Sequence, residues 1–372
     1  MTKKVSITDP CSIFIVWEGA NEKLHKIEAS LASQFNLLSK ITLNWTDANY
    51  FSNIDRLYTR PNQHRPLKDY SKKFGRPPYN AFVVRDSSPD IGYIQTTSGE
   101  IEFGNRNFLN AKREFRQGLS HPYLIHCTTT QEEFEFQARL IFGHQRVTVD
   151  ANFGDLYGSG GWADLDEMFA AINPYCRFCV LRAPNENDLG NPNFDLDILT
   201  DDFQRFASLS NVRQRRDKPF KGTVQIGKHN IRVDIRFVGD GYHPEHWQLK
   251  MLEGREARPG GLFLPKSEDR YFSLLYHCLL HKGYISQKYF DDFIYLEAEL
   301  CAPWKILEMD KSAQIELLRG YLSSNRYFSR LAVDIDVGFN RTVYNQLPRA
   351  EDHIRTTLKK HLRAALRRLR SS

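Results

Sequence analysis

The 372-residue chain lacks any apolar run long enough to cross a membrane as a helix, which takes about 20 consecutive residues. Its first residues, MTKKVSITDPCSIFIVW, also lack the long apolar core and the small-residue cleavage site of a secretory signal peptide. We therefore expect a cytoplasmic protein rather than a membrane-spanning or secreted one.

Cysteines are few, and the six that occur lack the paired spacing of a disulfide framework. An intracellular protein keeps such thiols reduced, which fits the expected location. Cys176 and Cys179 form a single CxxC, but the segment YCRFCVLR around them has the composition of a strand and no second pair stands nearby. Zinc binding and redox chemistry at this pair are therefore disfavoured.

Acidic residues are absent from His353 to Ser372, a segment that holds seven Lys and Arg. The other basic residues nearly balance the 45 acidic ones, so the net charge of +6 belongs to this tail. A near-neutral body argues against a broad nucleic-acid-binding face on the folded domains.

The tail has its own apolar pattern, because Ile354, Leu358, Leu362, Leu366 and Leu369 recur at steps of four and three among the cations. This spacing predicts a basic amphipathic helix, suited to an anionic membrane surface or an acidic partner. In the first case the protein would also lie at the inner face of the membrane. The alternative is a terminal helix packed on the preceding domain, with its cations in water.

Strand-like and helix-like patterns alternate over residues 1–145, which predicts an α/β domain. A strand is expected at residues 12–17. A helix is expected at residues 21–41, where apolar residues recur at steps of three and four. Further strands are expected at residues 41–45, 80–86 and 123–129, and further helices at residues 106–117 and 131–143.

The order FIVWEGA, helix, ITLNW, then GRPPYNAFVV and IHCTTTQEEFEFQARLIFG, resembles a nucleoside diphosphate kinase domain over residues 11–143. The resemblance implies a ferredoxin-like fold, with His126 at the place of the catalytic histidine and Arg113 at that of a phosphate-binding arginine. Two features depart from the family. The first strand runs into Trp17-Glu18-Gly19 without the family's lysine, and Gln137 replaces the glutamate that orients the histidine.

These departures favour a degenerate nucleotide-binding domain or a purely structural one over phosphotransfer through His126. Without a carboxylate partner the imidazole loses the group that fixes its tautomer and supports its charge. A histidine at a strand end, hydrogen-bonded within the fold, is the structural alternative.

The segment FDLDILT places Asp195 and Asp197 in alternation with Phe194, Leu196 and Ile198. Period-two alternation predicts a half-buried strand with both acids on one face. Two carboxylates roughly 7 Å apart on a strand repel each other unless a cation lies between them, and oxygen ligands suit magnesium. The alternative is a strand end with hydrated acids.

A third acid follows on the next alternating segment, NIRVDIRFV, where Arg232, Asp234 and Arg236 share one face. A second DxD, Asp334 and Asp336, lies on residues 333–337, which we also predict as an alternating strand. It competes as a metal site but ranks lower, because no third acidic strand follows it.

The order helix, strand, loop, DxD strand, helix, strand, acidic strand over residues 160–285 is similar to the nucleotidyltransferase superfamily with the DNA-polymerase-β-like fold. The resemblance implies that Asp195, Asp197 and Asp234 bind Mg²⁺ (or Mn²⁺) and serve nucleotidyl or phosphoryl transfer. It implies a nucleotide donor and a hydroxyl acceptor, expected to be a sugar or a cell-surface glycan intermediate in polysaccharide biosynthesis. Leu181-Arg182 stands where the family has Gly-Ser.

Two cations are candidates for binding phosphate. Arg182 precedes the acids, and a plain surface arginine is the alternative. Lys282 follows a predicted helix that also carries His277, which we expect to be a core histidine.

The predicted fold is therefore α/β (α+β) in two domains. A nucleoside-diphosphate-kinase-like domain covers residues 1–145, and a nucleotidyltransferase-like mixed sheet with helices covers residues 146–285. Helices with the basic tail follow at residues 286–372. Three functions are open: a metal-dependent transferase, a nucleotide-binding or scaffold protein without catalysis, and a kinase acting through His126.

Overall fold

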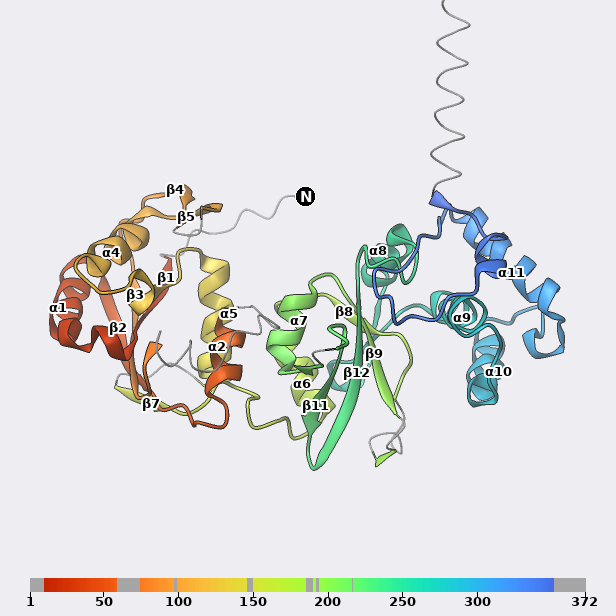
Figure 1. Ribbon diagram of the computed structural model, residues 1–372, viewed down its shortest axis with the longest axis horizontal. Helices are drawn as coiled ribbons and strands as arrows, with labels where there is room; N and C mark the ends of the chain where they lie inside the picture. Colours follow the sequence, from red (N-terminus) through yellow and green to blue (C-terminus); the bar gives the residue numbers. More distant parts are fainter. Residues whose placement is uncertain are drawn as a thin grey trace, which may run out of the picture. The chain divides into compact units, whose positions relative to one another are not determined.

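The computed structural model describes residues 10–58, 74–96, 99–145, 150–184, 190–191, 194–215 and 217–350. The predicted amphipathic tail lies outside these residues. The described chain has a mixed α/β fold, as the sequence predicts, and divides into two compact units (Figure 1). Unit 1 is Met1–Trp162 with Ser208–Asn211, and unit 2 is Ala163–Ala207 with Val212–Ser372. Among the described residues, no helix is both long and apolar enough to cross a membrane.

Unit 1 is built on a five-stranded sheet with the order β6-β1-β3-β2-β7. The pairs β1–β3, β1–β6 and β2–β3 are antiparallel, and β2–β7 is parallel. Helix α1 connects β1 to β2, and α4 precedes β6. The elements are β1 (Cys11–Val16), α1 (Leu24–Gln34), β2 (Asn36–Leu43), α2 (Tyr50–Leu57), β3 (Tyr79–Arg85), β4 (Ile91–Gln95), β5 (Ile101–Asn105), α4 (Arg106–Arg116), β6 (Ile125–Cys127), α5 (Gln131–Phe142) and β7 (Ala151–Phe153).

Strand β1 is apolar over most of its length because it lies inside the sheet, between β6 and β3, and packs against α5. Phe14 on this strand contacts Phe108 and Phe115 of α4 and Phe35 at the end of α1. Burying such aromatic side chains supplies much of the hydrophobic stabilisation of the unit.

The predicted helix at residues 21–41 is wrong in its second half. Helix α1 ends at Gln34, Phe35 is extended with φ −136° and ψ 164°, and β2 begins at Asn36. Pairing of β2 with β3 satisfies the backbone of residues 36–43, so tertiary pairing outweighs the helical spacing of the apolar residues. The two-stranded sheet β4–β5 was not predicted.

Unit 2 contains a second five-stranded sheet with the order β10-β11-β12-β9-β8. Strands β9 and β12 are parallel, and the other neighbours are antiparallel. The elements are α6 (Leu165–Ile172), β8 (Phe178–Val180), β9 (Asp195–Thr200), α7 (Phe203–Ser210), β10 (Arg213–Gln214), β11 (Lys221–Ile226), β12 (His229–Phe237), α8 (Glu245–Glu253), β13 (Glu256–Ala257), β14 (Phe263–Leu264), α9 (Ser267–Tyr276), α10 (Phe290–Glu299), α11 (Lys311–Ser324) and α12 (Arg341–Tyr344).

Helix α9 is the centre of the helical part of unit 2 and continues into a π-helical turn, His277–Lys282. Helices α10 and α11 pack against α9, and α12 packs against the π-helical turn. Tyr271 and Tyr276 of α9 and Trp247 of α8 are fully buried in this core.

The strand predicted at residues 333–337 is wrong, because the structure has a loop there. The Asp334 carboxylate accepts a hydrogen bond from Asp336 N at 3.1 Å, and Asp334 O accepts one from Val337 N at 3.2 Å. These local bonds form a turn, which competes with extended pairing.

Candidate functional site

The candidate site lies on the parallel pair β9–β12. In its register Asp197 lies beside Asp234, and Asp195 lies beside Arg232. Neighbouring strands are about 4.8 Å apart, so the fold holds the Asp197 and Asp234 carboxylates side by side on one face of the sheet. The structure therefore brings together the three acids that the sequence singled out.

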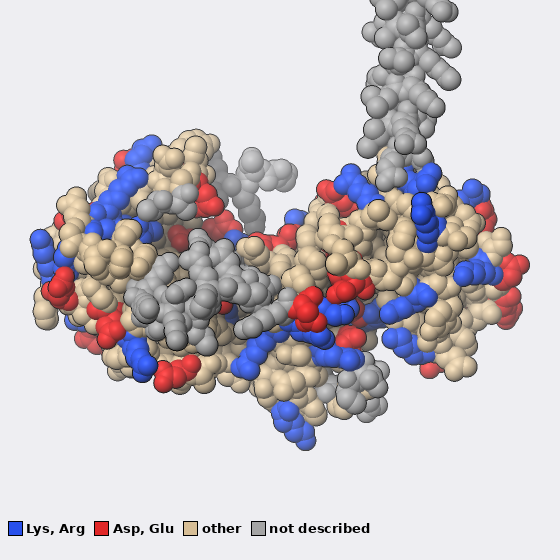
Figure 2. All heavy atoms as spheres, in the orientation of Figure 1, with Lys and Arg blue, Asp and Glu red and all other residues tan. Residues whose placement is uncertain are grey.

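Each of these carboxylates already has a cationic partner. Figure 2 shows Lys and Arg atoms against Asp and Glu atoms over this part of unit 2. Among the described residues, no group of three His, Cys, Asp or Glu side chains is arranged to hold a metal. The site is close to charge balance as it stands. The pairs are Asp195–Arg232 at 2.6 Å, Asp197–Arg182, Asp234–Arg236 at 2.7 Å and Asp234–Lys221 at 3.2 Å.

Asp197 is the most constrained of the three acids. Burial raises the pKa of its carboxyl, the Arg182 guanidinium opposes this, and the charges of Asp234 and Asp195 add to the rise. Burial alone would lower the pKa of Arg182, but Asp197 more than offsets it and the pKa is raised. Arg182 therefore stays charged. Burial and the neighbouring acids raise the pKa of Asp197, and the Arg182 charge favours its ionised form.

The second DxD joins the same site through one arginine. The Arg236 side chain is 4% exposed, and its Nη1 lies 2.9 Å from Asp334 Oδ2 while its Nη2 lies 2.7 Å from Asp234 Oδ1. Its guanidinium stacks 4.4 Å from the centre of the Tyr242 ring. The two acidic motifs, predicted to compete as metal sites, are thus bridged by Arg236.

A buried hydrogen-bonded chain lies behind the acids. Tyr242 Oη is 2.5 Å from His277 Nδ1, and His277 Nε2 is 3.1 Å from Tyr289 Oη. Burial keeps the pKa of His277 well below its usual value, so the ring is neutral and donates from one nitrogen only. The Tyr289 ring lies 5.6 Å from the Arg182 guanidinium, which links this chain to the site.

A small cavity of about 10 Å³ touches both Asp197 and this chain. Its volume fits about one water molecule. His243, which lines it, is fully buried. The full lining is Leu181, Arg182, Asp197, Arg236, Tyr242, His243, Ser273, Leu274 and His277.

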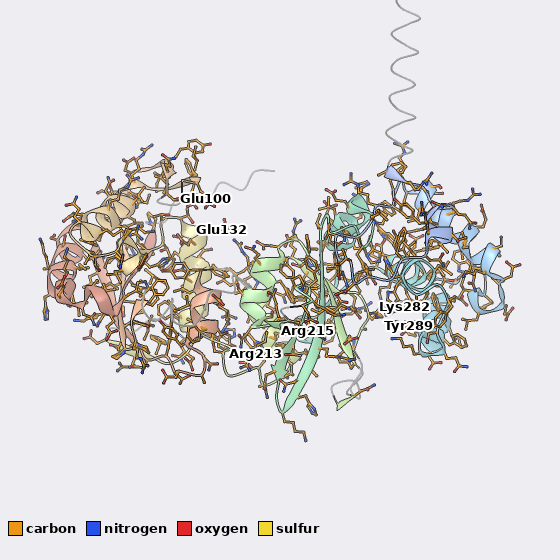
Figure 3. All side chains as sticks on the ribbon, in the orientation of Figure 1. Glu100, Glu132, Arg213, Arg215, Lys282 and Tyr289 are labelled. Carbon is orange, nitrogen blue, oxygen red and sulfur yellow. The ribbon has the colours of Figure 1, made fainter. Side chains whose placement is uncertain are left out.

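Lys282 lies at the edge of this region. Lys282 is labelled in Figure 3 near Tyr289. It is exposed at the end of the π-helical turn, and its charge adds to the lowering of the pKa of His277. His281 lies one residue earlier, with Nδ1 3.0 Å from Gly338 O and Nε2 3.0 Å from Tyr242 O. Burial lowers the pKa of His281 to about 4, so the neutral ring donates to one carbonyl at a time.

In unit 1 His126 is a buried strand residue. Its Nε2 is 2.8 Å from Gln137 Oε1, and the Tyr58 ring packs against it edge-on. Burial, reinforced by the charge of Lys112, lowers the pKa of His126 to about 3, while Gln137 opposes the shift. Arg113 is exposed and donates to Gln95 O at 3.0 Å. Arg113 and His126 thus have different hydrogen-bond partners in the structure.

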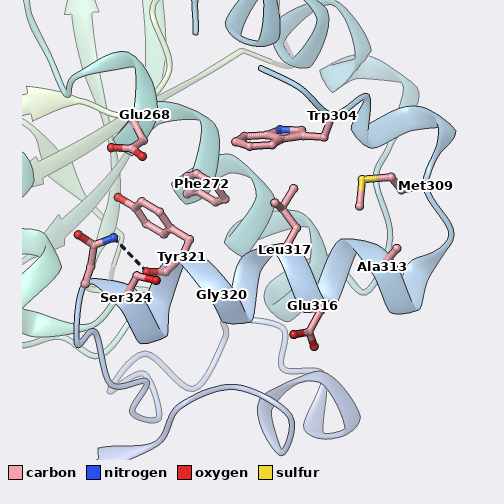
Figure 4. A pocket seen from close by; sticks show the side chains of 11 residues that line it. Glu268, Phe272, Trp304, Met309, Ala313, Glu316, Leu317, Gly320, Tyr321 and Ser324 are labelled. Carbon is pink, nitrogen blue, oxygen red and sulfur yellow. Dashed lines mark hydrogen bonds between the residues drawn. The ribbon is translucent and has the colours of Figure 1, made fainter. Parts of the chain in front are cut away.

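A separate groove of about 590 Å³ lies between α9 and α11 (Figure 4). Phe272 and Tyr321 stack in it with ring centres 3.8 Å apart, and Trp304 forms one side. None of the residues singled out from the sequence lines this groove. The lining is Glu268, Phe272, Trp304, Met309, Ala313, Glu316, Leu317, Gly320, Tyr321, Ser324 and Asn325.

Comparison with protein-family models, with curated proteins and with solved structures finds no match to this chain. Its function is therefore inferred from the side chains described above.

Proposed function

We propose that unit 2 catalyses metal-dependent transfer of a nucleotidyl or phosphoryl group to a hydroxyl acceptor. The observation that carries this is the parallel register that sets Asp234 beside Asp197, with Asp195 on the same face. The order α6, β8, β9, α7, β12, with β8 antiparallel and β12 parallel to β9, supports the likeness to the DNA-polymerase-β-like nucleotidyltransferases. In unit 1 the order β6-β1-β3-β2 supports the ferredoxin-like expectation.

The donor set fits a hard divalent cation, since it offers only carboxylate oxygens. Asp195, Asp197 and Asp234 would hold Mg²⁺ or Mn²⁺, which neutralises charge on the transferring phosphate when bound. In the structure, arginines pair with these carboxylates. Binding of the ion to Asp197 therefore requires Arg182 to be displaced.

Arg182 has a second use once it leaves Asp197. A guanidinium presents several donors in a plane and pairs well with phosphate oxygens. The nucleotide phosphates bring the negative charge that Asp197 no longer supplies to Arg182. Lys282, exposed beside His277, is a second cation for the phosphate or for its leaving group.

Asp234 is the residue we assign to the acceptor. It lies opposite Asp197 and is held by Arg236 and Lys221, so its carboxylate is fixed in direction. There it accepts the proton of the attacking hydroxyl. The acceptor class is a sugar or a glycan intermediate, as the resemblance implies.

A second candidate is a nucleotide-binding or scaffold protein without catalysis. It is favoured by the pairing of every acid of the site with a cation and by the lack of a ready metal group among the described residues. Phosphotransfer through His126 is a weaker candidate, because the ring is buried and Nε2 is engaged by Gln137.

Manganese binding, read by electron paramagnetic resonance with and without a non-hydrolysable nucleotide, separates the first two candidates. We expect the wild type to bind Mn²⁺ and Asp197→Asn to lose at least about tenfold in affinity, since one ligand charge is removed. Asp217→Asn is the matched control, because Asp217 is an exposed acid of the same unit paired with Arg215. Equal Mn²⁺ binding in all three proteins, with nucleotide affinity unchanged by a chelator, would favour the scaffold.

A further inference from the structure

A loop over residues 331–339 in unit 2, here called the apolar loop, carries four exposed apolar side chains. Their exposed fractions are 57% for Leu331, 56% for Val333, 96% for Ile335 and 43% for Phe339. Clusters of this kind on a protein surface mark contacts with other proteins or with membranes.

The apolar loop is fixed to the body by its polar residues. Asp334 pairs with Arg236 beneath it, and Asp336 lies 3.6 Å from Lys218. Val333 N donates to Asp240 O at 2.8 Å. Asp334 is therefore buried, whereas the apolar side chains around it are exposed, which is the reverse of the usual arrangement in a surface loop.

The described part of the chain ends next to this loop. Ala350, the last described residue, donates from its N to Ser329 O at 3.2 Å, and Ser329 lies two residues before Leu331. Seven Lys and Arg with no acid follow from His353 onward. These tail residues lie outside the described residues.

Further cations flank the apolar loop on the body. Arg326 precedes it, Arg341 follows it, and Lys282 lies next to Gly283, where an added Cβ would come 3.4 Å from Asn340 at the end of the loop. All three are exposed, and none has a carboxylate partner in the part of the chain that the structure describes. The acid Asp336 in the loop is also exposed but lies near Lys218, so the cations without a carboxylate partner among the described residues leave an excess of positive charge here.

We propose that the apolar loop and the basic tail together bind the surface of an anionic membrane, with Ile335 entering the boundary between headgroups and acyl chains. Either feature alone gives weak and reversible attachment, whereas an apolar insertion combined with a polybasic segment gives stable binding. The loop also reaches the acids through Asp334 and Arg236, so the membrane would lie beside the β9–β12 site. Membrane binding does not depend on the proposed transfer reaction and is tested without it.

A comparable apolar group in unit 1 serves as an internal control. Tyr93, Ile101 and Phe103 of the β4–β5 hairpin are 62% to 74% exposed. The acids Glu100 and Glu102 stand among them (Figure 3 labels Glu100). These two acids oppose insertion of the hairpin into an anionic surface, so its apolar residues should contribute little to vesicle binding.

The test is flotation of the full chain with vesicles of phosphatidylcholine alone or mixed with phosphatidylglycerol. We expect binding to the mixed vesicles and little to the zwitterionic ones. Val333→Ser combined with Ile335→Ser should lower the partition coefficient about tenfold or more, because two apolar side chains lose their insertion. Ile101→Ser should leave it unchanged.

A second measurement tests insertion of the loop directly, so a folding defect of the double variant does not decide the outcome. Ile335→Trp places a fluorophore at the most exposed position, and its emission should shift to the blue on mixed vesicles and be quenched by brominated lipid. A wild type that floats with neither vesicle, or a double variant that floats like the wild type with an unchanged melting temperature, would overturn the proposal. If the wild type floated with neither kind of vesicle, the exposed side chains of the apolar loop would instead indicate a contact with another protein.

Discussion

Asp197 of β9 and Asp234 of β12 are register partners on neighbouring parallel strands. Two carboxylates at this separation repel each other, and the structure relieves the repulsion with one arginine on each, Arg182 on Asp197 and Arg236 on Asp234. The two arginines differ in burial. Arg236 is nearly inaccessible, whereas Arg182 is partly exposed. Arg182 is therefore the partner that a ligand is able to displace.

Arg182→Met should raise the affinity for Mn²⁺ in the absence of nucleotide by about tenfold. The substitution removes the cation that competes with the metal for Asp197 and leaves that carboxylate without its cationic partner beside Asp234. The same variant should bind the manganese complex of a nucleotide more weakly than the wild type, because Arg182 then no longer reaches the phosphates. The two opposite changes are measured by paramagnetic resonance and by calorimetry.

The control for this prediction is Arg177→Met. Arg177 pairs with Asp201 at 2.7 Å at the far end of β9 and is half-exposed. Its loss should leave both affinities unchanged. If Arg182→Met weakened the binding of Mn²⁺ alone, Arg182 would be a support of the acids and not their competitor.

Arg236→Met should destabilise unit 2 by about 3–5 kcal/mol, because it leaves Asp334 buried without its cationic partner and leaves Asp234 with Lys221 alone. Arg236→Lys should cost less, since the charge stays while the two-sided geometry is lost. Urea denaturation gives the free energy of unfolding. Removing an exposed partner such as Arg215 should produce no measurable change, because its pair with Asp217 is solvated.

The sequence was informative where periodicity and local turns decide the structure. The alternation around Asp195 and Asp197 predicted both the strand β9 and the common face of the acids. The position of the Gly227-Lys228 turn also fixes the register of β11 with β12. Counting outward from the turn along both strands places Lys221 opposite Asp234. That cation was missed, although the signal for it was present.

Other features depend on contacts between segments that are distant in the sequence, and local sequence patterns do not predict them. The helical spacing of residues 35–41 is overruled by pairing with β3, and no local signal reports that partner. Residues 333–337 alternate like a strand, but Asp334 turns inward to Arg236 nearly a hundred positions earlier. The bridge between the two acidic motifs is therefore a property of the fold.

His126 should make unit 1 sensitive to acid. Its pKa is lowered to about 3 in the folded state, against about 6.5 for an ordinary histidine. The folded state therefore binds fewer protons than the unfolded state between these values, so stability is fully present above about pH 6.5 and is lost as the pH falls toward the lowered pKa.

Between about pH 6.5 and pH 4 this loss should reach about 3 kcal/mol. His126→Gln keeps a polar partner for Gln137 and removes the titration, so its free energy of unfolding should fall less over the same range. Denaturant titrations at a series of pH values give the difference between the two proteins. A wild type and variant with parallel pH profiles would show that His126 takes up its proton in the folded state.

Two glycines of unit 2 should respond to alanine with opposite signs. Gly241 has φ +75°, and an added Cβ would come 2.2 Å from Leu331 O at the start of the apolar loop. Strain and backbone displacement should together cost about 2–3 kcal/mol. Gly320 lies inside α11 and is exposed, with no atom within 4 Å of its added Cβ. Gly320→Ala should therefore stabilise the unit by about 1 kcal/mol, through the helix propensity of alanine.

The pair also tests whether the apolar loop is held as the structure has it. If Leu331 lies against Gly241, then Gly241→Ala should destabilise the unit and increase proteolysis within residues 331–339. Gly320→Ala should reduce unfolding and leave that cleavage unchanged. Equal and small effects of both substitutions on the urea midpoint would mean that Leu331 moves away from Gly241 at little cost. The loop would then lack the fixed outward display of Ile335 on which insertion into a membrane depends.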